Sequence, residues 1–130
     1  ACTYTHDHHN LLVAGKTAHE CAMAANWVIA HQGGYCVVEH NEITASLELE
    51  VGGIVSEAPL EEMAQHAQDI TQALLRMGYQ FKENPIMSFS VLGLSVSPQL
   101  RITDKGYVKV KAGQLLPLFD EEASRQPKEE

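Results

Sequence analysis

The sequence has few cysteines, few basic residues and no long apolar run, and each shortage excludes a class of protein. Its three cysteines, Cys2, Cys21 and Cys36, are odd in number and lack Cys-x-x-Cys spacing. We therefore expect no disulfide framework, and a cytoplasmic location. No apolar run reaches the roughly 18 residues that a membrane span needs, so no membrane partner is expected. The polar start ACTYTH has neither the basic region nor the apolar segment of a signal peptide.

Basic residues are outnumbered, with nine Lys and Arg against 17 Asp and Glu and a formal net charge of -8. Nucleic-acid backbones are bound by clustered Lys and Arg, so nucleic acid is not an expected partner. Part of the acidity lies in DEEASRQPKEE, residues 120–130, which we expect to be a disordered tail. Residues 1–119 are long enough for one domain with its own core.

The first half of the chain predicts strands and a helix. We expect short strands at 1–5 and 11–14, then a helix begun by the capping box TAHE at 17–20 and ended by the glycines at 33–34. Segments 35–40 and 42–51 predict paired strands around a turn at Asn41. The apolar stripe expected for this helix comprises Ala18, Cys21, Ala22, Ala25, Val28 and Ile29.

A second helix is expected after Ser56, as its cap, and before Gly78. Segment 84–98 predicts a short helical turn followed by extended chain, and 103–106 a turn with Asp104 as side-chain acceptor. One or two short strands should follow in 106–119. The second helix's expected apolar stripe comprises Leu60, Met63, Ala64, Ala67, Ile70, Leu74 and Leu75.

These elements predict an α+β fold in which two helices cover an antiparallel sheet. The expected order is approximately ββαββα with short C-terminal strands. We expect such a sheet to leave one face for something else to cover, such as a partner domain.

Residues 5–10, THDHHN, are the strongest candidate for chemistry. On an extended strand His6 and His8 project to one side and Asp7 and His9 to the other. A pair at i and i+2 can chelate a metal, with a third ligand from elsewhere. Alternatively, Asp7, His9 and Asn10 only satisfy backbone groups in a turn. Residue types alone leave a metal site, a substrate site and a structural turn open.

Several motifs, in order, resemble one known family, the C-terminal domains of bacterial and archaeal adenine deaminases of the amidohydrolase superfamily. They are HDHHNLLVAG at 6–15, HQGGYCVV at 31–38, VGGIVSEAP at 51–59, PIMSFSVLGLSVSPQLRITDKGYVKV at 85–110 and LLPLF at 115–119. Together they extend over nearly all of residues 1–119. His8 departs from the family pattern, which usually has a small residue there.

The resemblance implies a parent enzyme that converts adenine and water to hypoxanthine and ammonia, using Mn, Fe or Zn on a (β/α)₈ barrel. That barrel precedes this domain and would be its partner. We therefore expect no catalytic residue and no cofactor within this segment alone, and no activity from it. The resemblance makes His6, Asp7, His9 and Asn10 candidates to face the active site, where they would cap the pocket or brace the barrel.

A second hypothesis belongs to a different class. The chain could be a free-standing protein of the same fold that binds a small ligand or a metal without deaminase activity. His8 favours it, because with His6 and His9 it adds a third imidazole as a metal-ligand candidate. Formation of a homo-oligomer is left open by the sequence.

Overall fold

The computed structural model describes residues 1–80, 82–96 and 99–117. By its internal contacts the chain divides into two units, residues 1–92 and 93–130. The tail predicted at 120–130, together with the end of the LLPLF motif, lies outside the described residues. In the described part of the chain, no helix is long and apolar enough to cross a membrane. The structure confirms the α+β fold class.

The first unit is built on an antiparallel hairpin. Strand β1 (Gly34–Glu39) pairs with β2 (Glu42–Glu48), as the sequence predicts. His40 and Asn41 form the turn with φ of 54° and 62°. Positive φ at both central residues gives the turn a twist that matches that of the strands. A β-bulge interrupts the register at Val37 and Val38.

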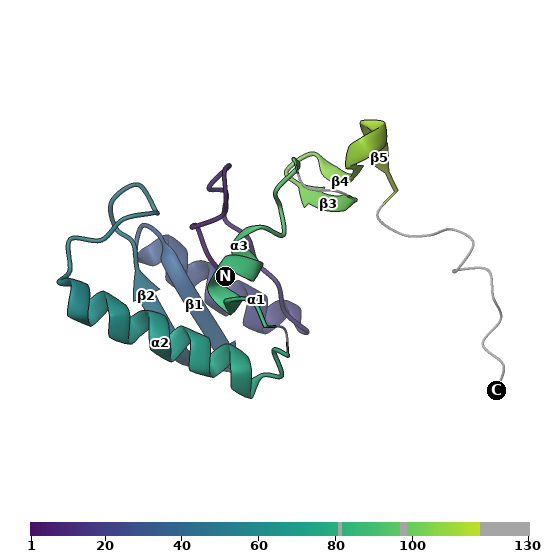
Figure 1. The fold of residues 1–130 in the computed structure, drawn as a ribbon. Helices are drawn as coiled ribbons and strands as arrows, with labels where there is room; N and C mark the ends of the chain where they lie inside the picture. The colour runs from purple at the N-terminus through teal and green to yellow at the C-terminus, as the bar shows by residue number, and fades with distance from the viewer. Residues whose placement is uncertain (81, 97–98, 118–130) are drawn as a thin grey trace, which may run out of the picture. The chain divides into compact units, whose positions relative to one another are not determined.

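Helices α1 (Ala18–Ala30) and α2 (Leu60–Arg76) lie on opposite faces of this hairpin (Figure 1). The expected open sheet face is therefore covered along β1. The reason is that the strand residues Tyr35 to Val38 are apolar on both faces of the strand, and every one of them is buried. A strand of that kind needs an apolar layer on each side.

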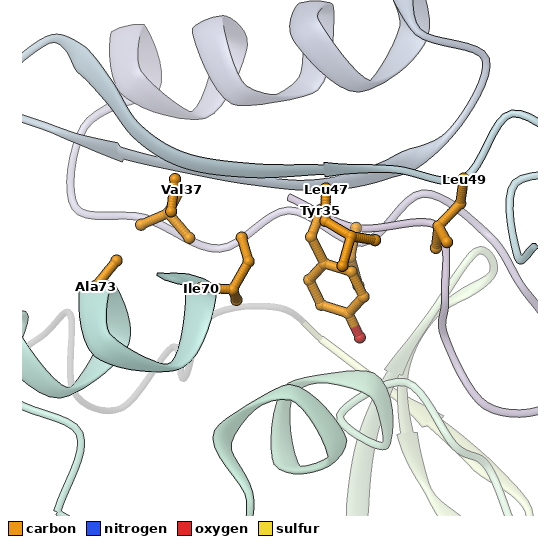
Figure 2. Packing of buried hydrophobic residues seen from close by; sticks show 8 residues of the cluster. Tyr35, Val37, Leu47, Leu49, Ile70 and Ala73 are labelled. Carbon is orange, nitrogen blue, oxygen red and sulfur yellow. The ribbon is translucent and has the colours of Figure 1, made fainter. Parts of the chain in front are cut away.

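The main core lies between the hairpin and α2. Figure 2 shows Tyr35, Val37 and Leu47 directed from the strands toward Ile70 and Ala73 of α2. Ile70 and Ala73 are fully buried. On the other face, Ala24 and Val28 of α1 pack against Cys36 and Val38 of β1 in a second, smaller cluster.

The N-terminal residues extend the hairpin by one short strand-like segment. Backbone hydrogen bonds join Cys2 to Leu12 in both directions, each 2.9 Å, and Cys2 also bridges to Tyr35. The strands expected at 1–5 and 11–14 are thus reduced to isolated bridges. Residues 1–3 nevertheless lie between Leu12 and β1.

The predicted start of α1 is confirmed. Thr17 is its N-cap and accepts a hydrogen bond from the Glu20 amide at 3.3 Å. The predicted stripe is only partly correct, since Val28 is buried but Ala22 is exposed and Ile29 is 65% exposed. α1 packs against one edge of a narrow hairpin, so the outer part of its apolar surface stays uncovered.

The glycines at 33–34 have a different role from the predicted one. α1 ends at Ala30, and Gln32 takes the left-handed conformation with φ 62°. Gly33 and Gly34 each have φ of 137°, and a Cβ on Gly34 would overlap the Leu47 carbonyl oxygen. Gly34 is required where β1 approaches β2, and Gly33 is required where the chain approaches the backbone of Leu49 and Gly53.

The prediction that Ser56 caps the second helix is wrong. α2 begins at Leu60 after Pro59, and the Ser56 hydroxyl instead donates to the Glu50 carboxylate at 2.9 Å. Proline disfavours helical geometry in the residue before it, so Ala58 delays the helix. The Glu50 carboxylate also accepts the Glu57 amide at 2.9 Å, which lowers the pKa of Glu50.

The remaining elements are short. Helix α3 (Pro85–Ser90) belongs to the first unit and confirms the predicted helical turn, but turns at 91–93 and 95–96 stand in place of the extended chain expected after it. The second unit holds β3 (Leu100–Thr103), β4 (Gly106–Lys109), the 3₁₀ helix η1 (Val110–Ala112) and β5 (Gln114–Leu116), with the strands in antiparallel order β3-β4-β5. β3 was not predicted.

The turn at 103–106 is confirmed, but the Thr103 hydroxyl, not Asp104, accepts the Lys105 amide at 3.2 Å.

Core burial predicts a large difference between two apolar residues of α2. Ile70→Ala should lower the free energy of unfolding by about 2–5 kcal/mol, because it leaves a cavity beneath the hairpin. Leu60→Ala is the matched control, since Leu60 is 79% exposed, and should change it by about 0.5 kcal/mol or less. Urea denaturation followed by circular dichroism measures both. Equal destabilisation by the two changes would contradict this core.

Candidate functional site

The histidine-rich turn is anchored at its base by Thr5, which is fully buried. The Thr5 hydroxyl donates to the Asn10 carbonyl at 2.6 Å, and the Thr5 carbonyl accepts the His9 amide at 2.7 Å. The His6 amide donates to the carbonyl of Ser90 at the end of α3, at 3.0 Å. Both ends of the turn are therefore fixed by hydrogen bonds from buried positions. Sequence reasoning missed Thr5 and Ser90, although a hydroxyl residue just before a polar turn is a signal for such a contact.

A tyrosine supports the turn from below. The Tyr35 hydroxyl lies 3.2 Å from the Tyr4 carbonyl and 3.3 Å from the Ile86 carbonyl, so it connects the approach to the turn with α3. Burial raises the pKa of the Cys2 thiol to about 11, and burial likewise raises the pKa of Tyr35. Both groups are neutral across the physiological range. Neither the Cys2 thiol nor the Tyr35 hydroxyl therefore carries a charge.

His8 differs from its neighbours because its ring is used by the turn itself. Its Nδ1 accepts the Asn10 amide at 3.2 Å and lies 3.4 Å from the Thr5 hydroxyl. Because the amide is a donor, Nδ1 is the acceptor in this contact. His8 thus stabilises the turn, and only its Nε2 is free of this contact.

The other four candidates are exposed on the turn. His6 Nε2 lies 3.0 Å from the Asp7 carboxylate, so these two side chains form a pair at the tip. His9 has φ 49°, and its ring centroid lies 6.0 Å from that of Tyr4. The turn therefore presents two imidazoles, a carboxylate and an amide from a fixed backbone. Such a set can donate and accept hydrogen bonds toward a polar ligand.

The donor set does not complete a metal site within the described residues. His6 and Asp7 offer two neighbouring donors, but no group of three or more His, Cys, Asp or Glu that could hold an ion occurs in 1–80, 82–96 and 99–117. A protein zinc site supplies three or four ligands. A metal bound by His6, His8 or His9 stays a prediction that would need ligands from elsewhere.

The sequence matches a family model described as the adenine deaminase C-terminal domain over residues 1–114. Adenine deaminase 2 of Shouchella clausii is 53% identical over 95% of this chain and 22% of its own length. Adenine deaminase of Clostridium perfringens is 47% identical over 92% of this chain and 21% of its own length. Adenine deaminase 2 of Oenococcus oeni is 40% identical over the same shares. The chain thus spans about a fifth of the length of these curated relatives.

The buried hydroxyl at the base of the turn gives a test of its rigidity. Thr5→Val keeps the side-chain shape but removes the donor to the Asn10 carbonyl, which should cost about 1–3 kcal/mol of unfolding free energy. Amide exchange at His9 and Asn10 should become faster. Thr71→Val is the control, because the Thr71 hydroxyl donates only to the Ala67 carbonyl within α2. Unchanged exchange in the turn of Thr5→Val would show that another contact fixes it.

Proposed function

Because the chain belongs to the family of adenine deaminase C-terminal domains, we propose that it is an accessory domain that caps or braces an active site carried by another domain. In this proposal the larger enzyme converts adenine and water to hypoxanthine and ammonia. It works in the cytoplasm, as the three unpaired cysteines favour. The turn at residues 6–10 faces the active site.

The anchoring of the turn is the observation that carries this proposal. Polar side chains that serve only solubility need no fixed backbone, whereas a group that positions a ligand must be held within a fraction of an ångström. Thr5 and Ser90, both fully buried, fix the turn on two sides. In the proposal His6, Asp7, His9 and Asn10 orient the purine, close the pocket or brace neighbouring loops.

The outer surface of α1 supports contact with a further domain. Ala18 and Ala22 are exposed, and Ile29 on the same side is 65% exposed. Positions 18, 22 and 29 fall on one helix face, and their side chains are small or apolar. A face of this kind packs closely against another element. We propose that the preceding barrel of the parent enzyme is the partner that covers it.

A divalent metal, Mn, Fe or Zn, would supply the activated water in the parent enzyme. The described residues of this chain provide two adjacent donors at most, at His6 and Asp7, so they do not fit a complete metal centre. We therefore assign metal binding to the barrel. The residues of the turn would act on substrate or on neighbouring loops through hydrogen bonds.

His8 is the residue that favours the alternative, a free-standing metal- or ligand-binding protein. In the structure His8 Nδ1 is occupied by the Asn10 amide. No specific contact in the described residues favours this alternative.

The first prediction from this proposal concerns the isolated chain. Purified residues 1–130 with added Mn²⁺, Fe²⁺ or Zn²⁺ should not convert adenine to hypoxanthine, because two donors do not hold and activate a metal-bound water. Chromatographic separation of the two purines measures the reaction. Turnover that depends on the added metal would show that the chain holds a complete site.

The second prediction concerns His9 in a full-length deaminase that carries this domain. His9→Ala should lower kcat at least tenfold, equivalent to about 1.4 kcal/mol at the barrier, while the melting temperature changes by about 2 °C or less. His19→Ala is the control, since His19 is an exposed histidine on α1 and is not part of the turn at residues 6–10. Steady-state kinetics and calorimetry separate the two effects. A lower melting temperature with unchanged kcat would mean that the turn is purely structural.

A further inference from the structure

A groove of about 420 Å³ opens beside β1, next to the point where residue 1 lies. Its walls are formed by β1 and by the segment that leads into α1. Val37, Val38 and Glu39 of β1 form one side, and Ala14, Gly15 and Lys16 form another. All of these residues belong to the first unit. The groove therefore lies along one edge of the central sheet.

Hydrogen bonds along this edge join residues 1–3 to β1, and the Gly34 amide donates to the Thr3 hydroxyl at 2.8 Å. The Ala1 nitrogen donates to the Cys36 carbonyl at 2.8 Å, and the Cys36 amide donates to the Ala1 carbonyl at 2.9 Å. The Thr3 amide donates to the Gly34 carbonyl at 3.0 Å. Residues 1–3 thus form an antiparallel strand against β1. Their partners on β1 are alternate residues, as an antiparallel ladder requires.

The same alternation directs the backbone of Val38 into the groove. Gly34 and Cys36 present their N–H and C=O groups to residues 1–3, so Val38, two positions further, presents its groups to the same edge. Among the backbone hydrogen bonds of the described residues, none on that edge involves Val38. Val38 is nevertheless 7% exposed. One rung of the ladder is therefore missing at a sheltered position.

The wall of the groove that faces β1, at Ala14, is spaced so that a strand continuing residues 1–3 fits between the two. Cys2 lies between Tyr35 on one side and Leu12 on the other. A residue placed two positions before Cys2 would by the same register lie between Val37 and Ala14. Both of these line the groove. The groove therefore has the geometry of a slot for one strand that continues residues 1–3.

The slot has a different lining on each face. Side chains in a strand alternate between faces, so a residue directly before Ala1 would share the face of Cys2, which belongs to the core cluster with Ile70. On that face the slot is lined by Ile70, Leu74, Met77 and Phe89. The next residue would share the face of Ala1, which packs against the α1 cluster. There the lining includes Lys16, Glu20 and Cys21.

The amino group of Ala1 is poorly suited to its surroundings. Burial lowers its pKa below the ordinary value for a chain terminus, since the charged form loses hydration. The Ala1 nitrogen donates a hydrogen bond to the Cys36 carbonyl, and the N–H of a neutral peptide group could donate the same bond. A peptide bond at this nitrogen would remove the desolvated charge and keep the hydrogen bond.

We propose that this slot receives, as an added antiparallel strand, the polypeptide segment that leads into the domain in full-length members of the family. This chain matches about a fifth of the length of its relatives, and the matched family is a C-terminal domain, so in them other chain precedes it. In those members, the residue that corresponds to the position directly before Ala1 is apolar and packs against the counterparts of Ile70 and Phe89. The residue before that one completes the ladder at Val38. This inference goes beyond the proposed function and does not depend on it.

The other edge of the sheet is unsuited to the same role. β2 has its register shifted by the bulge opposite Val37 and Val38, and its ends carry the exposed Glu42 and Glu48. Bulges and charged side chains discourage strand addition at an edge. On β1 the alternation continues through Val38, because the residue that the register skips, Thr44, lies on β2.

Two chains with four added residues before Ala1 test the proposal. One carries Thr-Val-Thr-Leu, which places leucine on the face of Ile70. The other carries Val-Thr-Leu-Thr, which has the same composition in the opposite alternation and serves as the matched control. Hydrogen exchange measures the Val38 amide. Mass spectrometry measures alkylation of Cys21, which lines the slot and is more accessible than the buried Cys2 and Cys36.

Thr-Val-Thr-Leu should slow exchange at Val38 at least tenfold and slow alkylation of Cys21, whereas Val-Thr-Leu-Thr should affect both much less. Unchanged exchange and alkylation with the first extension, or equal effects of the two, would overturn the proposal. The proposal would also be overturned if exchange of the Val38 amide in the unextended chain became slower as the protein concentration rose. In that case the slot would bind a second copy of the chain. None of these results depends on deaminase activity.

Discussion

Burial of β1 on both faces is the constraint on which the rest of the first unit depends. Tyr35 and Val37 pack toward α2, while Cys36 and Val38 pack toward α1. Fully burying one such side chain stabilises a fold by about 1.5–3 kcal/mol, so this short strand requires a helix on each side. The same closeness of layers requires glycine at 33 and 34, where a Cβ would meet the backbone of β2 or of the loop after it.

Elements fixed by neighbouring residues could be predicted from the sequence, and elements fixed by distant ones could not. The capping box at Thr17 and Glu20 and the turn at Asn41 involve contacts within a few residues. Ser56 fits an N-cap equally well by local rules, but the Glu50 carboxylate takes its hydroxyl. The uncovered outer face of α1 follows from the narrow width of the hairpin, which the apolar pattern of the helix does not encode.

The candidate site shows the same division. Its position was predicted by the density of imidazole and carboxylate groups in six residues. The different contacts of its histidines could not be predicted, because these contacts depend on the orientation of the rings and of the backbone. His8 accepts the Asn10 amide, whereas His6 pairs with Asp7 at the exposed tip. Ser90, more than 80 residues away in the sequence, holds the turn through its carbonyl. Whether the exposed groups contact a purine stays a proposal.

The end of α1 has an optical consequence. Trp27 is the sole tryptophan of the chain, and the His31 ring stacks on it with centroids 4.0 Å apart and planes inclined by 17°. His31 Nε2 also lies 3.7 Å from the Glu48 carboxylate at the end of β2. Because the emission of an indole responds to its surroundings, Trp27 is an intrinsic, label-free reporter of whether helix and strand remain docked.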